Sequence, residues 1–285
     1  TANDMEIHEI VNGEQRLLVT TNSDITILNR SGAANIWSVN FWTTTLAQAA
    51  MSTSVHHPIV RLERVITIGD LDTDGVAVAH TIDKNDVVVN KRLTFPIGYS
   101  VRNIYTTTNR FWYGLQNNFG RNAKVAEWDG SAESFNHLYD LQGQYPISGF
   151  TKDEIPYFIT DVGIIYKFNG SAFEEFQRFP NADERILFDL GSGTMFDHEL
   201  IVSGIQNYGC VVEQDKVHIL VGAPSGSRRM RSGKWILDLK TKRLYLESML
   251  SRYKSTDTDI DFGQSRLYRI GGLINLFGAT GKFLA

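Results

Sequence analysis

A four-residue pattern, Asp/Asn-Gly-Ser-Ala, occurs twice in the sequence between segments rich in aromatic residues. The two copies begin at Asp129 and Asn169 and are 40 positions apart. Asp and Asn tolerate a left-handed backbone and Gly has no Cβ to clash, so each copy suits a tight hairpin turn. A turn that recurs at this interval predicts a supersecondary unit of about 40 residues that the chain contains more than once.

Short runs of β-branched and aromatic residues, ended by Asn, Asp or Gly, fill most of the chain, which is typical of hairpin-linked strands. Three passages align, each with an apolar strand ending in Thr, a polar turn, a second strand, and a third strand with Trp or Phe; the threonines are Thr21, Thr108 and Thr160. A fourth copy is expected at 217–247, with its turn at 238–243. Further hairpins are expected at 76–93 and 210–221, and the best helical candidate is the short segment 44–52.

Strand repeats of about 40–50 residues predict a β-propeller, because one four-stranded sheet cannot bury both of its faces alone. Stacked blades bury those faces and hide most strand edges. We therefore expect an all-β fold, a β-propeller of about six blades, with five or seven as alternatives. Residues 1–285 are expected to form a single propeller domain, to which flanking segments of a longer protein could be joined. A β-sandwich is the main rival, but it leaves the repeat unexplained.

Composition narrows the classes of partner. Of the 285 residues 42% are hydrophobic and 21% charged, which is enough apolar material for a substantial core. The net charge of −4 gives no general attraction to phosphate backbones, so no direct nucleic-acid partner is expected. The one cysteine, Cys210, excludes an intramolecular disulfide. No apolar run approaches the roughly 18 residues of a membrane helix, and the opening TANDMEIHE does not resemble a signal peptide.

Two runs carry a resemblance to known propellers: PYFITDVGIIYKFNGSAFEEF at 156–176 and KWILDLKTKRLYLE at 234–247. They resemble the degenerate blade repeats of bacterial sensor propellers and of β-propeller virion proteins in tailed bacteriophages. The latter resemblance implies a non-enzymatic structural protein of the phage tail or head–tail region. It would be located in the virion, with other structural proteins as partners in an oligomeric assembly. An extracellular or cell-surface location is the alternative, and the resemblance transfers no functional residue.

The most specific local motif is an alternation of acids that ends in glycine. Asp70, Asp72 and Asp74 could turn three carboxylates toward one point, and the following Gly75 permits a sharp bend, as in loops that bind Ca²⁺. The acid that would close such a loop is missing, because Val78 and Thr81 occupy its positions. Calcium is therefore the only cofactor that the sequence suggests. The alternative interpretation of the motif is a solvated hairpin turn.

A basic cluster is the preferred interaction patch. It comprises Arg228, Arg229, Arg231 and Lys234, in a loop that leads into the strand of Trp235. Arginine forks suit carboxylate or phosphate, so an acidic surface of a protein partner is one interpretation and simple solvation is the other. The five tryptophans could stack on sugars, but in a blade architecture most should pack in the core.

Catalytic signatures are weak. The histidines have no metal-ligand spacing, so we expect core or surface roles for them, and no Gly-x-Ser-x-Gly nucleophile motif occurs. An enzyme is therefore not the favoured interpretation. The alternative function is a carbohydrate-binding or glycoside-hydrolysing propeller, since a glycosidase needs two carboxylates at one pocket. The acids available for it are Asp70, Asp72, Asp74, Asp259 and Asp261.

Overall fold

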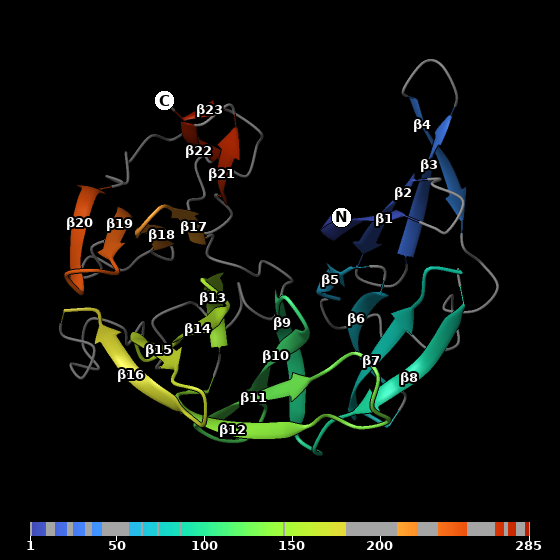
Figure 1. Cartoon of the computed structure of the whole chain (residues 1–285), viewed down its shortest axis with the longest axis horizontal. Coiled ribbons are helices and arrows are strands. Elements are labelled where there is room, and N and C mark those ends of the chain that lie inside the picture. Colours follow the sequence, from blue (N-terminus) through green and yellow to red (C-terminus); the bar gives the residue numbers. More distant parts are fainter. Residues whose placement is uncertain are drawn as a thin grey trace, which may run out of the picture. The chain divides into compact units, whose positions relative to one another are not determined.

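The computed structural model describes residues 2–9, 15–21, 25–31, 36–41, 57–63, 65–72, 74–85, 87–144, 146–180, 210–221, 233–249, 266–270, 273–277 and 283–284. Within these ranges the regular secondary structure consists of β-strands joined by turns (Figure 1). The chain divides into two compact units, Thr1–Pro146 and Ile147–Ala285.

The first unit contains three four-stranded sheets. Their strands are β1 (Ala2–Glu9), β2 (Gln15–Thr21), β3 (Ile25–Ser31) and β4 (Ile36–Phe41); β5 (Ile59–Leu62), β6 (Val65–Leu71), β7 (Ala77–Ile82) and β8 (Val88–Thr94); and β9 (Tyr99–Thr107), β10 (Arg110–Asn117), β11 (Asn122–Trp128) and β12 (His137–Gln142). Each sheet is an antiparallel meander in which neighbouring strands follow one another in the sequence. This is how the blades of a β-propeller are built.

The second unit continues the same construction. It contains β13 (Pro146–Lys152), β14 (Ile155–Thr160), β15 (Ile164–Phe168) and β16 (Phe173–Arg178); then β17 (Cys210–Glu213), β18 (Lys216–Val221), β19 (Gly233–Asp238) and β20 (Arg243–Met249); and a three-stranded sheet of β21 (Arg266–Ile270), β22 (Leu273–Phe277) and β23 (Phe283–Leu284). The described residues therefore form six successive antiparallel sheets, in agreement with the expected number of blades.

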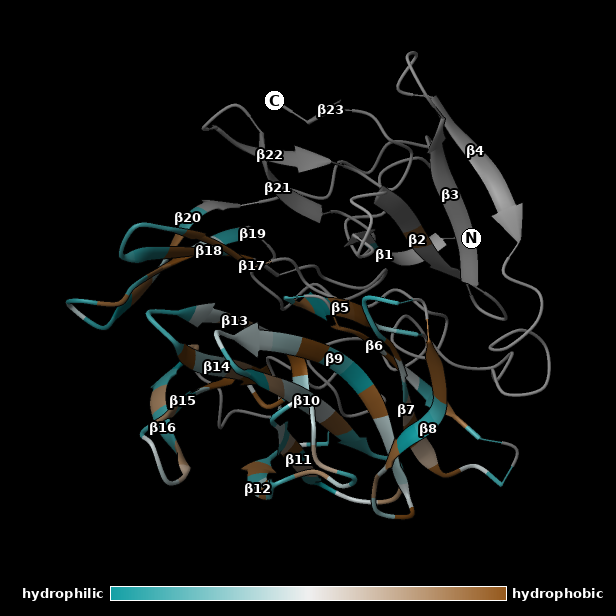
Figure 2. Cartoon of the chain, turned by 45° about the vertical axis from the view of Figure 1, so that its right-hand side comes forward, coloured by the Kyte–Doolittle hydropathy of each residue, from teal (hydrophilic) through white to brown (hydrophobic). Residues whose placement is uncertain are grey.

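Burial differs between the inner and outer strands of a sheet. All six residues of β7 are buried, whereas most residues of the outer strand β8 are exposed. The same contrast separates β10 from β12, and β14 from β16. Inner strands are covered on both faces, so they need near-continuous apolar runs instead of a simple alternation. Figure 2 shows the resulting hydrophobic stretches along the strands and hydrophilic residues at many turns.

The core of the first unit includes a layer between the second and third sheets. Phe95 follows β8, and its ring centroid lies 5.1 Å from that of Tyr113 on β10. A Cβ added at Gly69 of β6 would lie 2.6 Å from Cγ1 of Val101 on β9. Glycine is therefore required there because the two sheets approach too closely for a side chain.

The repeated Gly-Ser-Ala motif forms the turn that the sequence predicted. Asp129-Gly130 joins β11 to β12 and Asn169-Gly170 joins β15 to β16, so both copies connect the third and fourth strands of a sheet. Both glycines have positive φ, 83° at Gly130 and 100° at Gly170. The expected fourth copy is also present, as β18, β19 and β20, and the hairpins expected at 76–93 and 210–221 are β7–β8 and β17–β18.

One alignment was wrong. Thr21 and Thr160 end second strands, β2 and β14, but Thr108 follows β9, the first strand of its sheet. The passage from Asn103 is therefore displaced by one strand relative to the other two. Strands of one blade share an apolar composition, so a Thr at a strand end does not identify the strand's position in the blade. The helix expected at 44–52 lies outside the described residues.

Candidate functional site

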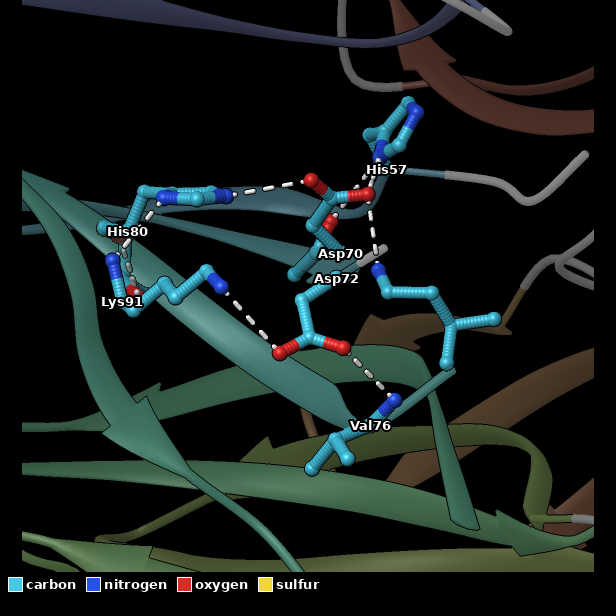
Figure 3. Close-up of polar contacts among 9 residues, drawn as sticks. His57, Asp70, Asp72, Val76, His80 and Lys91 are labelled. Atoms are coloured by element: carbon cyan, nitrogen blue, oxygen red, sulfur yellow. Dashed lines mark hydrogen bonds and ion pairs between the residues drawn. The ribbon is translucent and has the colours of Figure 1, made fainter. Parts of the chain in front are cut away.

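The described residues place two histidines on either side of one buried aspartate (Figure 3). Asp70 lies near the end of β6, and its Oδ2 is 3.1 Å from Nε2 of His80 on β7. Its Oδ1 is 3.3 Å from Nδ1 of His57 and accepts a 2.7 Å hydrogen bond from the N–H of Leu71. None of the three side chains is exposed. We call these three residues the His–Asp–His cluster.

Strand register brings Asp70 and His80 together. Asp70 is directly opposite Val78 on β7, so His80, two residues further on, is its diagonal neighbour on the same face of the sheet. His57 precedes β5 and donates from Nδ1 to the carbonyl oxygen of Gly69, 3.1 Å away. A carbonyl can only accept, so Nδ1 of His57 carries a hydrogen.

The proton on His80 is fixed by a bulge in the neighbouring strand. The pairing of β7 with β8 shifts between Ala79 and Thr81, and Lys91 of β8 has a left-handed φ of 50°. The N–H of Lys91 is thereby turned toward Nδ1 of His80, at 3.1 Å. Nδ1 is the acceptor, so Nε2 carries the hydrogen and donates to Asp70. The bulge thus supplies the backbone donor that selects this tautomer.

The three predicted calcium ligands have different surroundings. Asp70 belongs to the His–Asp–His cluster, whereas Asp72 accepts hydrogen bonds from the backbone N–H groups of Asp74 and Val76, both at 2.9 Å. Nζ of Lys91 lies 3.2 Å from the other oxygen of Asp72 (Figure 3). The Val76 N–H is the main cause of the lowered pKa of Asp72, and Lys91 contributes to it. Asp74 is exposed at the turn.

A metal cluster is not evident in this part of the molecule. Among the residues that the structure describes, no three His, Cys, Asp or Glu side chains gather so that they could hold a metal ion. Calcium binding by Asp70, Asp72 and Asp74 stays a prediction, which a calcium titration followed by thermal unfolding would test.

Most of the predicted basic patch falls outside the described residues. Arg228, Arg229 and Arg231 lie in that part of the chain. Lys234 is described. It directly precedes Trp235 in β19, and its Nζ is 2.6 Å from Oε2 of Glu247 on β20. The neighbouring strand therefore already supplies a counter-ion to this lysine, and the interaction role of the patch stays a prediction.

The expected core role of tryptophan is confirmed where side chains are described. Trp112, Trp128 and Trp235 are buried, and Nε1 of Trp128 donates to the carbonyl oxygen of Ala132 in the Gly-Ser-Ala turn. His57, His80 and His218 are likewise buried, which agrees with the core positions that were one of the two roles expected for the histidines.

Sequence reasoning did not find the His–Asp–His cluster. His57 lies 13 positions before Asp70 and His80 lies 10 after it, and neither interval corresponds to a known ligand or triad spacing. One feature of the sequence could have indicated the cluster: Asp70 lies near the end of an expected strand, and the next strand along the chain contains His80.

Comparison with solved structures identifies the fold class. The crystal structure of the computationally designed Ika8 protein, which is propeller-like, matches with a TM-score of 0.53 and 10% identity, covering 99% of this chain and 71% of Ika8. BamB from Moraxella catarrhalis, a β-propeller, matches with a TM-score of 0.44 and 11% identity, covering 98% of this chain and 75% of BamB. No protein-family model and no curated protein matches the sequence.

The successive antiparallel sheets and the likeness to Ika8 confirm the fold class expected from the sequence: the protein is all-β, with a multi-blade propeller fold. At this level of identity the likeness concerns the fold and not the activity. In the described part of the chain, no helix has the length and hydropathy needed to cross a bilayer.

Proposed function

We propose that this protein is a non-enzymatic propeller that acts as an assembly module, and that it is a structural component of the tail or head–tail region of a tailed-bacteriophage virion. In this role the blades provide stiffness, and the loops at the strand ends contact neighbouring structural proteins in an oligomeric assembly. Preorganised loops bind with a smaller loss of conformational entropy, which suits a display scaffold.

The observation that carries the proposal is the way in which the described turns are fixed. In six of the described turns, one side-chain oxygen at the start of the turn accepts hydrogen bonds from the backbone N–H groups that follow it, which locks the loop without help from a ligand. The six residues that do so are Asp72, Asp83, Asn117, Asp129, Asn169 and Asp238.

The enclosed His–Asp–His cluster gives further support. A general acid or base must reach its substrate within about 3 Å, but Asp70 and His80 are enclosed within the fold. Asp70 contacts His80, His57 and the N–H of Leu71, and His80 also accepts from the N–H of Lys91 on the adjacent strand. An internal cross-link of the β5–β8 sheet fits this geometry better than acid–base chemistry.

The virion assignment rests on the resemblance of the blade repeats at 156–176 and 234–247 to those of phage propellers. The test is gentle isolation from the native source, followed by native mass spectrometry and gradient sedimentation. We expect the protein to sediment with particles, or with structural proteins at a fixed stoichiometry. Recovery of the protein as a monomer, separated from all particles and other proteins at physiological salt, would contradict the proposal.

A further inference from the structure

Two loops of the first unit come together and present apolar side chains to solvent. The loop between β8 and β9 contains Ile97, and the loop between β10 and β11 contains Phe119; they are 83% and 87% exposed. The N–H of Asn118 donates to the carbonyl oxygen of Gly98 at 2.8 Å. We call Ile97 and Phe119 the rim patch.

The Phe119 ring lies against the backbone of Gly98. A Cβ added at Gly98 would be 3.1 Å from Cδ2 of Phe119, and Gly98 has a φ of 86°, which disfavours any other residue. The ring therefore rests next to the residue that follows Ile97. The two exposed apolar residues therefore belong to loops that touch at Gly98, whereas apolar residues on protein surfaces are commonly isolated.

Hydrogen bonds hold this surface in place. Oδ1 of Asn117 accepts from the N–H groups of Phe119 and Gly120, both at 2.9 Å. The Asn118 amide exchanges hydrogen bonds with the hydroxyl of Ser100. The conformation of both loops is thus determined by polar contacts, and the fold does not require an aromatic ring at position 119.

One positive charge accompanies the rim patch. Arg121 is the only charged residue in the stretches 94–100 and 116–123. It is exposed, and within the described ranges no carboxylate pairs with it. The next cation along the strand, Lys124, already pairs with Asp140. An unneutralised arginine two residues from Phe119 favours a partner that brings a carboxylate next to apolar residues.

We propose that Ile97, Phe119 and Arg121 form a docking surface for a partner-protein segment in which apolar side chains are flanked by glutamate or aspartate. The apolar side chains cover the rim patch, and a carboxylate pairs with the Arg121 guanidinium. This inference rests on the proposed function, because it specifies the chemistry of one contact that such an assembly module would make.

The probe is an array of synthetic 12-residue peptides that carry two or three apolar residues at varied spacing. Each peptide is made with glutamate flanks, with lysine flanks, and with serines in place of the apolar residues. We expect the whole protein to bind glutamate-flanked peptides selectively. Phe119→Ser should weaken that binding by about tenfold or more, since exposed aromatic anchors dominate interfaces of this kind.

Charge reversal separates a docking role from a structural one. Arg121→Glu should shift the preference from glutamate-flanked to lysine-flanked peptides, an effect that a loss of folding could not produce. The matched control is Val87→Ser with Val89→Ser. It removes apolar side chains that are 53% and 40% exposed near the other end of β8, and it should leave binding unchanged.

Several outcomes would overturn the proposal: binding by no peptide of the array, equal binding of both charge classes, or binding that is indifferent to Phe119→Ser. Self-association, or binding to phosphatidylcholine vesicles, that Phe119→Ser abolishes would assign the patch to a second copy or to lipid and would also overturn it. If stoichiometric partners are found in the native source while the array fails, this inference is wrong and the proposed function stands.

Discussion

At the scale of single residues, each position of the Asp/Asn-Gly-Ser-Ala motif has a definite role. Oδ1 of Asp129 accepts from the Ser131 N–H at 2.8 Å and the Ala132 N–H at 2.9 Å. Oδ1 of Asn169 makes the corresponding bonds to the third and fourth residues of its copy, at 3.0 and 2.9 Å. The first residue accepts, the glycine takes the positive φ, and the next two donate. Carboxylate and amide are interchangeable because only an acceptor oxygen is needed.

This equivalence can be tested at Asp129. Asp129→Ala should lower the free energy of unfolding by about 1 kcal/mol, because the turn loses its acceptor at a site where water partly replaces it. Asp129→Asn should retain most of the stability, since asparagine fills the same position in the other copy. Urea unfolding measures both, and equal loss in the two variants would contradict the assigned role.

The same turn has a pH dependence of known sign. The N–H groups of Ala132 and then Ser131 lower the pKa of Asp129. The stability that this carboxylate contributes is therefore present above the ordinary carboxyl pKa, and it is lost as the pH falls through the lowered value in the folded protein. Asp129→Asn should accordingly show a weaker loss of stability in acid than the parent protein.

At the scale of elements, the β5–β8 sheet is cross-linked by polar groups inside it. The bulge at Lys91 interrupts the ladder, but its N–H is satisfied by His80, which in turn is held by Asp70. Removing the central carboxylate takes away the acceptor of the buried His80 Nε2–H and one acceptor of the Leu71 N–H, which is a costly change.

We expect Asp70→Ala to lower the free energy of unfolding by roughly 3 kcal/mol or more, in proportion to the buried polar groups left unsatisfied. Asp74→Ala is the matched control, because it removes an exposed acid of the same motif and should change stability by less than about 0.5 kcal/mol. Urea unfolding of both variants measures the difference. If the two variants were equally stable, the cluster would not be a structural cross-link.

The β17–β20 sheet contains another buried histidine, which has a different environment from His57 and His80. Nε2 of His218 lies 3.4 Å from Oε2 of Glu213, and the residue is 5% exposed. Burial is the main cause that lowers the pKa of His218 below its ordinary 6.5, and the Lys234 ammonium adds to this, while Glu247 and Glu213 oppose it.

The sign of the resulting pH effect follows from linkage. The unfolded chain binds a proton at His218 near pH 6.5, whereas the folded chain binds it only at lower pH. This contribution to stability is thus complete above pH 6.5 and is lost as the pH falls below that value. Urea midpoints at pH 7.5 and 5.5 should differ less in His218→Gln than in the parent protein. His137→Gln, which alters an exposed histidine, should keep the parental difference.

At the scale of the whole molecule, the repeat was sufficient to predict the fold class but not the buried chemistry. The 40-residue interval between Asp129 and Asn169 reports the period of the blades directly, because turns recur wherever the meander recurs. The cluster around Asp70 depends on strand register and on the bulge at Lys91, and neither is encoded in a spacing along the chain. The exposure of Phe119 could not be predicted either, because a Phe next to glycine and asparagine has the same local sequence whether its ring is buried or exposed.

The single cysteine offers a probe of whether the two compact units unfold together. Burial raises the pKa of the Cys210 thiol to about 12, and its Sγ lies 3.3 Å from Oγ of Ser148 on β13. Reaction with a thiol reagent requires the thiolate, so native protein at pH 8 should be labelled slowly. A propeller that forms one domain should label in a single transition in urea, at the midpoint given by circular dichroism.

We expect the two midpoints to coincide, because in a one-domain propeller each repeat is stabilised by its neighbours. Ser148→Ala serves as a control. It removes only the hydroxyl group that contacts the thiol, so the labelling midpoint and the circular dichroism midpoint should still coincide. A different result is possible: Cys210 could be fully labelled at a urea concentration where most of the circular dichroism signal persists. That result would show that the unit containing Cys210, Ile147–Ala285, unfolds by itself. The expectation of one domain over residues 1–285 would then be wrong, even though every sheet described above would keep its place within its own unit.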